Sequence, residues 1–301
     1  MKITLTGSLG HIGKPLAVKL VEQGHEVKVI SSNVDRGKEI SALGATPAIG
    51  KLQDTDFLID HFKESDLVYT LVPPDNYFDH SLDLFGYFKE LGNSFADAIR
   101  KSGVSKVVNL SSIGAHLETG NGILEGTYQV EKSLDDLPEN VSVTHIRPVE
   151  IYYNLYQYID LIKGHGIMAS NLKPDTVNAW VAIPDIVDCI VDEMNGNIVG
   201  RNVRYVVSEE VTYQELASAI GGAIGLPDLQ WVQITDAQMQ ENLTQVGMQP
   251  KIAEKMTEMY TAIRSGLLYE HYWQNKPQTF GVVKLKDFAK DFAVAYHNKG
   301  Q

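Results

Sequence analysis

Two side chains that could exchange protons lie one helical turn apart in the stretch YQVEK. Tyr128 and Lys132 are four residues apart, so on a helix they share one face. A lysine ammonium beside a phenol lowers the pKa of the phenol, which lets a tyrosine act as an acid or base. Ser112 ends the run KVVNLSS and could orient a substrate carbonyl, although 16 residues separate it from Tyr128. The alternative is a surface helix with a packed tyrosine and a solvated lysine.

The stretch TGSLGHIG holds three glycines at intervals of three residues. Backbone N–H groups at a helix N-terminus bind a pyrophosphate, and glycine leaves no side chain in the way. An apolar strand precedes this turn and Pro15 lies at the start of the next helix, which is the order that a dinucleotide site requires. A tight turn without a ligand is the alternative. The residues expected to bind the cofactor here are Gly7, Ser8, Gly10, His11, Ile12 and Gly13.

The residues after the second strand discriminate between the two nicotinamide cofactors. An acid at this point binds the ribose hydroxyls of NAD and repels the 2'-phosphate of NADP. The sequence has Ser31, Ser32 and Asn33 there, and Arg36 follows. Hydroxyl, amide and guanidinium groups bind phosphate oxygens, so the sequence favours NADP(H) over NAD(H). The alternative is a solvated Arg36 whose charge is partly offset by Asp35.

The elements that must position these residues alternate between short apolar strands and longer amphipathic helices. Strands are expected at KITLT, EVKVIS, ATPAIG, DLVYTLV, KVVNLSS and VSVTHIRP. This alternation predicts an α/β fold, a Rossmann-type doubly wound parallel sheet with a smaller, mainly helical substrate lobe. We expect an NAD(P)-binding domain at 1–150 and about 184–210, and the smaller lobe at about 151–183 and 211–301.

A substrate should lie beyond the carboxyl ends of the strands, because ligands of open α/β sheets bind there. The segments after YTLVPP, NLSS and HIRP are aromatic and weakly polar, which suits a planar apolar substrate that stacks on rings. Tyr156 is expected to belong to the core of the smaller lobe, and Trp180 and Trp273 are expected to be packing residues. The side chains expected to line the substrate site are Tyr77, His116, Tyr152 and Asn154.

Composition excludes several classes of function. The formal net charge of -12, without a cluster of basic residues, argues against nucleic-acid binding. Cys189 is the single cysteine, and no spacing of His and carboxylates indicates a metal site. No apolar stretch reaches the roughly 18 residues of a membrane span, and the N-terminus carries no secretory pattern. We therefore expect a cytoplasmic monomer or homodimer whose partner is a small-molecule substrate.

The motifs together resemble those of the short-chain dehydrogenase/reductase superfamily, and within it the atypical NmrA-like branch. The resemblance is carried by TGSLGHIG, VVNLSSIGA, YQVEKSL and VTHIRPVEIYYN, and covers about residues 1–225. It implies that the glycine turn binds pyrophosphate and that Lys132 binds ribose and nicotinamide. The branch often has histidine where this chain has Tyr128, which restores the Tyr and Lys pair. Ser32 and Lys51 depart from the pattern, since relatives often carry a basic residue and an acid at these positions.

This resemblance implies an enzyme similar to NADPH-dependent quinone and triphenylmethane reductases and azoreductase-like proteins. The expected reaction is hydride transfer from NADP(H) to a small quinone, carbonyl or conjugated substrate, with Tyr128 as the proton donor. One alternative is a non-catalytic protein that senses NAD(P) and acts through a protein partner. A second is an enzyme similar to nucleotide-sugar epimerases, although the region after residue 150 offers few arginines for a second diphosphate.

Overall fold

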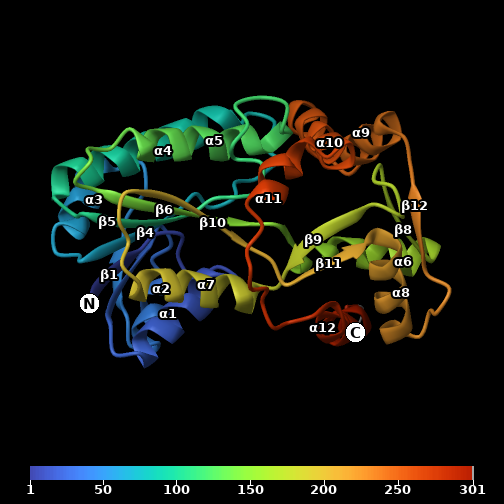
Figure 1. Ribbon diagram of the computed structural model, residues 1–301, viewed down its shortest axis with the longest axis horizontal. Helices are drawn as coiled ribbons and strands as arrows, with labels where there is room; N and C mark the ends of the chain where they lie inside the picture. The colour runs from blue at the N-terminus through green and yellow to red at the C-terminus, as the bar shows by residue number, and fades with distance from the viewer. Residues whose placement is uncertain (300–301) are drawn as a thin grey trace.

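The computed structural model describes residues 1–299, so the last two residues of the predicted smaller lobe lie outside it. Its main sheet has seven parallel strands in the order β10-β6-β5-β4-β1-β2-β3 (Figure 1). The predicted parallel sheet is confirmed, and a seventh strand from the segment at about 184–210, which was assigned to the same domain, joins it at one edge. The strands are β1 (Lys2–Leu5), β2 (Glu26–Ser31), β3 (Thr46–Ile49), β4 (Leu67–Leu71), β5 (Lys106–Leu110), β6 (Ser142–Pro148) and β10 (Arg201–Val206).

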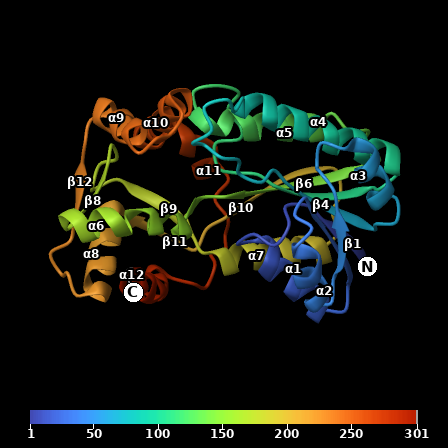
Figure 2. The same ribbon diagram turned by 180° about the vertical axis from the view of Figure 1, so that it is seen from behind.

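Helices cover both faces of this sheet. One face carries α1 (Gly13–Glu22), α2 (Arg36–Ala42) and α7 (Ile183–Asn195), and the other carries α3 (Thr55–Phe62), α4 (Leu84–Ser102) and α5 (Glu125–Asp135), as Figures 1 and 2 show. The strand order reverses between β1 and β4, because the chain first builds outward to β3 and then returns to the other side of β1. The carboxyl edge at this switch point is where a doubly wound sheet binds its ligands.

The second lobe lies beyond the carboxyl edge of the sheet (Figure 1). Besides helices it carries two small sheets that the sequence pattern did not indicate, β11-β9-β7 and β12-β8. Its helices α8 and α9 each begin with a capping box, in which Thr212 and Thr235 bond the backbone three residues on. Its elements are β7 (Glu150–Ile151), η2 (Tyr152–Tyr158), α6 (Ile159–His165), β8 (Ile167–Ser170), β9 (Val177–Val181), β11 (Glu209–Thr212), α8 (Tyr213–Ile224), β12 (Gln230–Gln233), α9 (Asp236–Gln245), α10 (Pro250–Ser265), η3 (Leu267–Tyr269), α11 (Glu270–Gln274) and α12 (Leu285–Asn298).

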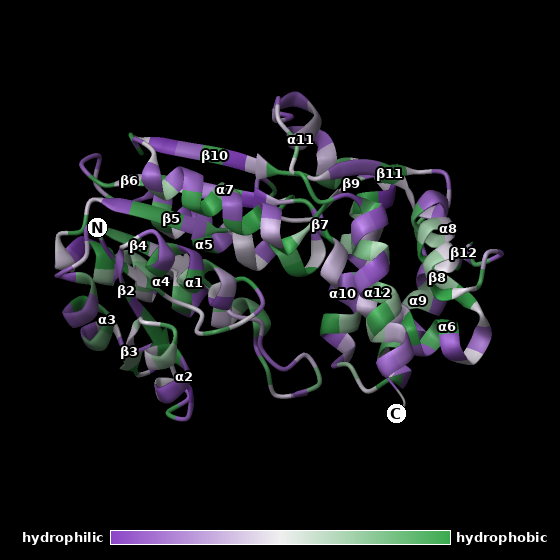
Figure 3. Cartoon of the chain, turned by 90° about the horizontal axis from the view of Figure 1, so that it is seen from below, coloured by the Kyte–Doolittle hydropathy of each residue, from purple (hydrophilic) through white to green (hydrophobic). Residues whose placement is uncertain are grey.

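The two larger of three apolar clusters in the described residues lie on the two faces of the sheet. One packs α1 and α7 against the sheet and continues into the second lobe, with Leu16, Ile186 and Phe292 as members. The other lies between the opposite face of the sheet and α3 to α5, and includes Phe95 and Val107. Because one core is shared by both lobes, burial of apolar surface fixes how the lobes sit on each other. The edge strand β10 is largely hydrophilic (Figure 3), which discourages pairing with other chains.

The segment 275–284, which we call the strap, links α11 to α12 past the end of β10 (Figure 1). Asp185 in α7 holds it, since its buried carboxylate accepts the backbone N–H groups of Val282 at 3.0 Å and Val283 at 3.1 Å. The hydroxyl of Ser208 donates to the same carboxylate at 2.5 Å. A β-carbon on Gly281 would overlap this carboxylate, so the strap passes α7 at a distance that only glycine allows.

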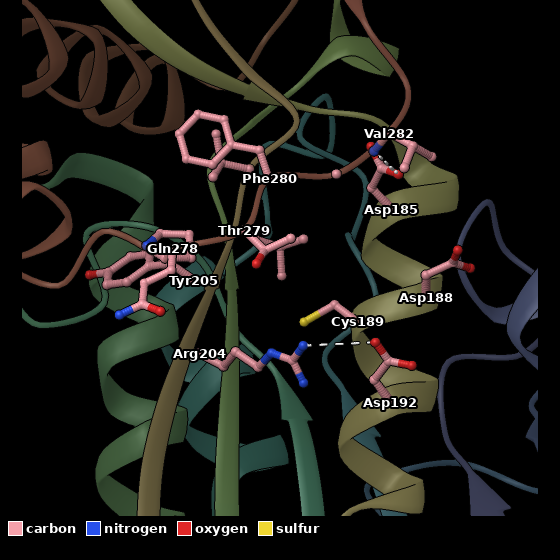
Figure 4. Close-up of a pocket in the computed structure, with 14 residues that line it drawn as sticks. Asp185, Asp188, Cys189, Asp192, Arg204, Tyr205, Gln278, Thr279, Phe280 and Val282 are labelled. Atoms are coloured by element: carbon pink, nitrogen blue, oxygen red, sulfur yellow. Dashed lines mark hydrogen bonds and ion pairs between the residues drawn. The ribbon is translucent and has the colours of Figure 1, made fainter.

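A cavity of about 350 Å³ lies between the strap, α7 and β10 (Figure 4). Cys189, Arg204 and Phe280 are among its lining residues, and Arg204 reaches Asp192 at 3.9 Å. None of its lining residues belongs to the glycine turn or to the ends of β4 and β5. The cavity therefore does not include the glycine turn, although Tyr205 in its wall also bonds Arg147 and His271.

Removing the charge of Asp185 should loosen the strap. The two carboxylate oxygens of Asp185 accept three donors, the N–H groups of Val282 and Val283 and the hydroxyl of Ser208. In Asp185→Asn only one side-chain oxygen remains as an acceptor, so we expect the free energy of unfolding to fall by about 1–3 kcal/mol. Urea unfolding measures this change. Asp192→Asn, on the same helix but 72% exposed, is the matched control and should change stability by less than about 0.5 kcal/mol. Equal losses of stability in the two variants would contradict a specific role of Asp185 in holding the strap.

Candidate cofactor and substrate site

The three glycines of the turn have different local environments. Gly7 has φ +87°, a conformation that favours glycine, and Ser8 follows with φ +58°. A β-carbon on Gly13 would overlap the carbonyl oxygen of Ser8, so Gly13 lets α1 pack closely on the turn. Gly10 is exposed, and a β-carbon there would meet only the carbonyl oxygen of Gly7, at 3.8 Å. Gly7 thus makes the turn, and Gly13 permits close packing of α1. Gly10 leaves an open face of the kind that a pyrophosphate needs for access.

The turn is tied to the end of β2. Ser8 Oγ donates to Ser31 Oγ at 2.9 Å, and Ser31 Oγ accepts the backbone N–H of Asn33 at 3.2 Å. The side chain of Asn33 accepts the backbone N–H of Asp35 at 2.9 Å, which closes the turn into α2. Ser31 is buried in this brace, whereas Ser32 and Asn33 are exposed. Of the two serines predicted to bind the cofactor at the end of β2, Ser31 and Ser32, only Ser32 has a hydroxyl that a ligand could reach.

Three charged side chains meet beside this turn. Glu39 receives Lys14 Nζ at 2.9 Å on one carboxylate oxygen and Arg36 Nη1 at 2.6 Å on the other. These hydrogen bonds, first that of Lys14 and then that of Arg36, lower the pKa of Glu39. The cluster carries a net charge of +1, since two cations share one carboxylate. Arg36, predicted as a phosphate ligand, is thus held in place by Glu39, with Lys14 as a second cation that the sequence analysis did not name.

The two residues before α1 connect the turn to the second lobe. The imidazole of His11 lies against the ring of Tyr153, with ring centroids 4.0 Å apart. Ile12 is half-buried and packs on the apolar core, while its carbonyl accepts the backbone N–H of Leu16 at 3.1 Å. The side chain of Ile12 is therefore turned to the core, and the exposed His11 lies between the turn and the second lobe.

Tyr128 and Lys132 both belong to α5 and are close enough to interact electrostatically, but the ammonium of Lys132 makes its hydrogen bond to another residue. Lys132 lies on the solvent face of α5, 58% exposed, and its ammonium bonds Asp136 at 3.1 Å. This ion pair raises the pKa of Lys132. Glu131 points inward instead and accepts the hydroxyl of Ser111. One residue along a helix is a rotation of about 100°, so neighbours in sequence lie on different faces.

Glu131 forms a buried ion pair with Arg147 of β6. The guanidinium donates from Nε at 2.9 Å and from Nη2 at 2.5 Å, and both side chains are 5% exposed. Burial alone would lower the pKa of Arg147, but the hydrogen-bonded carboxylate of Glu131 raises it above its ordinary value. Arg147 Nη1 also donates to Tyr205 at 3.4 Å. The pair fixes α5 against β6 next to Ser111, and the sequence analysis assigned neither member a role at the site.

His116 lies beside this ion pair. Its two ring nitrogens are buried and have no hydrogen-bond partner among the described residues. Burial first, and then the positive charge of Arg147, lower the pKa of His116 to about 4, so the ring is neutral at neutral pH. It packs on His271 with ring centroids 5.3 Å apart, and His271 Nδ1 bonds the hydroxyl of Tyr205 at 2.9 Å. His116, predicted to line the substrate site, thus lies beside a hydrogen-bonded network that runs from His271 of α11 through Tyr205, Arg147 and Glu131 to Ser111, without bonding to it.

The other predicted substrate residues have different surroundings. Tyr152 is fully buried between Trp180 and Phe288, with which it stacks at 5.7 and 5.1 Å, so the expectation that it lines the substrate site is wrong. Tyr77 is half-buried in the loop after β4, and its carbonyl accepts the backbone N–H of Gln249 at 2.9 Å. Asn154 is exposed. Long-range packing by the second lobe, invisible in the local pattern, decides which aromatics are core.

The two residues expected to act on a carbonyl, Ser112 and Tyr128, are both half-buried. Ser112 follows β5, and Tyr128 lies in the first turns of α5.

Among residues 1–299, no three His, Cys, Asp or Glu side chains gather in a way that could hold a metal ion. No helix in the described part of the chain is both long and apolar enough to cross a membrane.

Comparison with known proteins agrees with this geometry. The model of the NmrA-like family matches residues 1–276. The NAD(P)H azoreductase of Xenophilus azovorans is 25% identical over 268 residues, 86% of each chain. Among solved structures, the triphenylmethane reductase of Citrobacter sp. complexed with NADP(H) has a TM-score of 0.79 at 15% identity, covering 97% of this chain and all of its own.

The NADPH-dependent quinone oxidoreductase of Escherichia coli has a TM-score of 0.77, also at 15% identity, over 96% of this chain and 99% of its own. At such identities the two solved structures establish the fold alone. The family match is a different kind of finding, because it spans the glycine turn, the network around Glu131 and most of the second lobe. The chain belongs to the NmrA-like family.

Proposed function

We propose that this protein is an NAD(P)H-dependent reductase that transfers a hydride to a small quinone, carbonyl or conjugated substrate. The observation that carries the proposal is the glycine turn at the switch point, where Gly10 leaves an open face beside α1. Family membership supports it, since relatives with this architecture include an azoreductase and dye and quinone reductases. A nicotinamide cofactor bound here would supply the hydride.

The residues of the turn fit such a cofactor. Backbone N–H groups of the turn and the start of α1 would bind its pyrophosphate at Gly10, where no side chain intervenes. Ser32 and the cations of Lys14 and Arg36 would bind the ribose phosphate. The Glu131–Arg147 pair would hold Ser111 at the nicotinamide end of the site. These assignments favour NADP(H) over NAD(H), because Ser32 and Asn33 stand directly after β2, where NAD-binding sites carry an acid, and Asp35 comes only at the end of the turn.

The cofactor preference can be tested at Arg36. We expect Arg36→Ala to weaken NADPH binding about tenfold, because a charge-assisted hydrogen bond to the 2'-phosphate is lost, and to leave NADH binding unchanged. Fluorescence titration of both cofactors measures this. Lys38→Ala removes an exposed cation two residues further along α2 and is the matched control. A loss of the same size for NADH and NADPH would contradict a phosphate contact.

The activity itself is tested by mixing the protein and NADPH with quinones, azo and triphenylmethane dyes and aldehydes. Oxidation of NADPH that depends on an acceptor supports a reductase. A protein that binds NADP and NADPH with different affinity but reduces none of the acceptors would be the cofactor sensor of the alternative hypothesis. One observation favours that alternative, namely that Lys132, the lysine expected at the nicotinamide, is bonded to Asp136.

A further inference from the structure

A long loop leaves the main sheet beside the glycine turn. It joins β4 to α4, consists of residues 72–83, and contains neither a helix nor a strand. Its starting point is fixed, because a β-carbon on Gly7 would overlap the side chain of Leu71, the last residue of β4. The backbone N–H of Leu71 also donates to Thr6 Oγ at 2.8 Å. This β4–α4 loop therefore begins at the switch point of the sheet.

The same loop reaches the segment that leads into α5. Tyr77 packs in an apolar cluster with Ile123, which belongs to the short helix η1 (Gly122–Leu124) directly before α5. Helix α10 of the second lobe packs closely on η1, since a β-carbon on Gly122 would overlap the carbonyl oxygen of Lys255. The β4–α4 loop, the approach to α5 and helix α10 therefore meet at one place.

One residue of the second lobe holds the middle of the loop. Gln249 is the N-cap residue of α10 and is only 7% exposed. Its side-chain amide donates to the carbonyl oxygens of Asp79 at 3.2 Å and Leu82 at 2.8 Å. Its backbone N–H donates to the carbonyl oxygen of Tyr77 at 2.9 Å. Three hydrogen bonds from a single residue thus connect the second lobe to the loop.

The loop has little else to keep it in place. Within residues 74–83 only Tyr77 and Leu82 are half-buried, and the other residues are exposed. A segment with so few buried apolar contacts depends on its hydrogen bonds for a fixed position. A polar N-cap side chain usually bonds the first turn of its own helix, but Gln249 makes no such bond. Its amide bonds the loop instead.

We propose that Gln249 is a positioning residue that holds the β4–α4 loop, and with it Tyr77, as a wall of the substrate site, so this inference rests on the proposed function. The loop lies between the glycine turn, which binds the pyrophosphate in that function, and the start of α5, the helix whose Glu131 holds Ser111. The hydrogen bonds of Gln249 within residues 1–299 go to the loop and to its own helix, so it acts through the loop.

This arrangement has a definite kinetic consequence. A substrate finds a complete site only while the loop is bonded to Gln249, so its apparent affinity falls in proportion to the fraction of molecules in that state. A saturating substrate restores the bound position of the loop, and kcat is then retained. The cofactor turn does not depend on Gln249, so the affinity for NADPH should stay the same.

Hydrogen exchange followed by mass spectrometry tests the hold on the loop directly. In Gln249→Met the side chain keeps its length but loses both donors, so we expect amides within residues 76–82 to exchange about tenfold faster than in the wild type. Exchange in α1 should not change. Gln245→Met replaces an exposed glutamine of α9 and is the matched control, which should exchange like the wild type.

Steady-state kinetics with NADPH and a quinone separate positioning from a merely structural role. We expect Gln249→Met to raise the KM for the quinone about tenfold, while kcat stays within about threefold and the Kd of NADPH is unchanged. A residue that only stabilises the fold would lower the Tm and leave this KM as it is. Gln249→Asn keeps an amide at the buried position but is one methylene shorter, and should show the same changes at a smaller size.

Loop exchange at the wild-type rate in both Gln249 variants would overturn the proposal, and so would faster exchange without a change in KM. If the wild type binds NADPH but reduces no acceptor, the proposed function has failed. The exchange experiment is independent of turnover and then still decides whether Gln249 holds the loop.

Discussion

Gly10→Val is expected to weaken NADPH binding about 100-fold or more while the stability of the protein stays close to that of the wild type. The valine side chain would occupy the open face of the turn and keep the pyrophosphate from at least two backbone N–H groups. Hydrogen bonds to a charged group contribute about 1.5–3 kcal/mol each, which gives this magnitude. The free protein has room for the change, because a β-carbon on Gly10 meets only one atom, at 3.8 Å, and the residue has no positive φ.

Gly13→Ala is the matched variant at the other end of the same turn. Its β-carbon would overlap the carbonyl oxygen of Ser8, so the start of α1 must move away from the turn. We expect a loss of about 1–3 kcal/mol in the free energy of unfolding, together with weaker cofactor binding. Calorimetric titration and thermal unfolding of both variants separate the two effects. A Gly10→Val protein that binds NADPH like the wild type would place the pyrophosphate elsewhere.

The parts of the fold that the sequence predicted are those that depend on neighbours along the chain. The turn between β1 and α1 needs glycine at Gly7 for its φ and at Gly13 for close packing, and both requirements act within seven residues. The alternation of strands and helices likewise indicated the parallel sheet, because each crossover is built from one strand, one helix and one strand. Local chemistry was sufficient for these features.

The parts that the sequence missed depend on contacts between distant segments. The pattern YQVEK does not reveal whether Glu131 or Lys132 faces β6, because that depends on how α5 rotates when Arg147 is buried against it. Tyr152 was expected at the substrate because Trp180 and Phe288, its neighbours in the core, lie 28 and 136 residues further along the chain. An aromatic ring next to the end of a strand can line the substrate site or pack in the core. Which of the two it does depends on the distant segments that pack against it.

Breaking the ion pair between Glu131 and Arg147 should be the most destabilising single change at the site. In Glu131→Gln the guanidinium remains buried, 5% exposed, with an amide in place of its bidentate carboxylate partner. An uncompensated buried charge costs about 3–5 kcal/mol, and Ser111 must then compete with Arg147 for the single oxygen of the amide. Urea unfolding should show this loss. Asp60→Asn, in a pair with Lys63 whose members are 73% and 53% exposed, should change stability by less than about 1 kcal/mol.

The double variant Glu131→Met, Arg147→Met separates the strength of the attraction from the cost of burial. If most of the loss in each single variant comes from leaving one charge without its partner, the double variant, which buries no charge, should be more stable than either single variant. Losses that simply add would mean that the two side chains stabilise the protein independently, through their packing. The expected non-additivity would show that the ion pair is not needed for stability. An apolar pair would hold α5 against β6 equally well. It could not accept the hydroxyl of Ser111 at the nicotinamide end of the proposed site, so positioning Ser111 is the function that requires the charged pair.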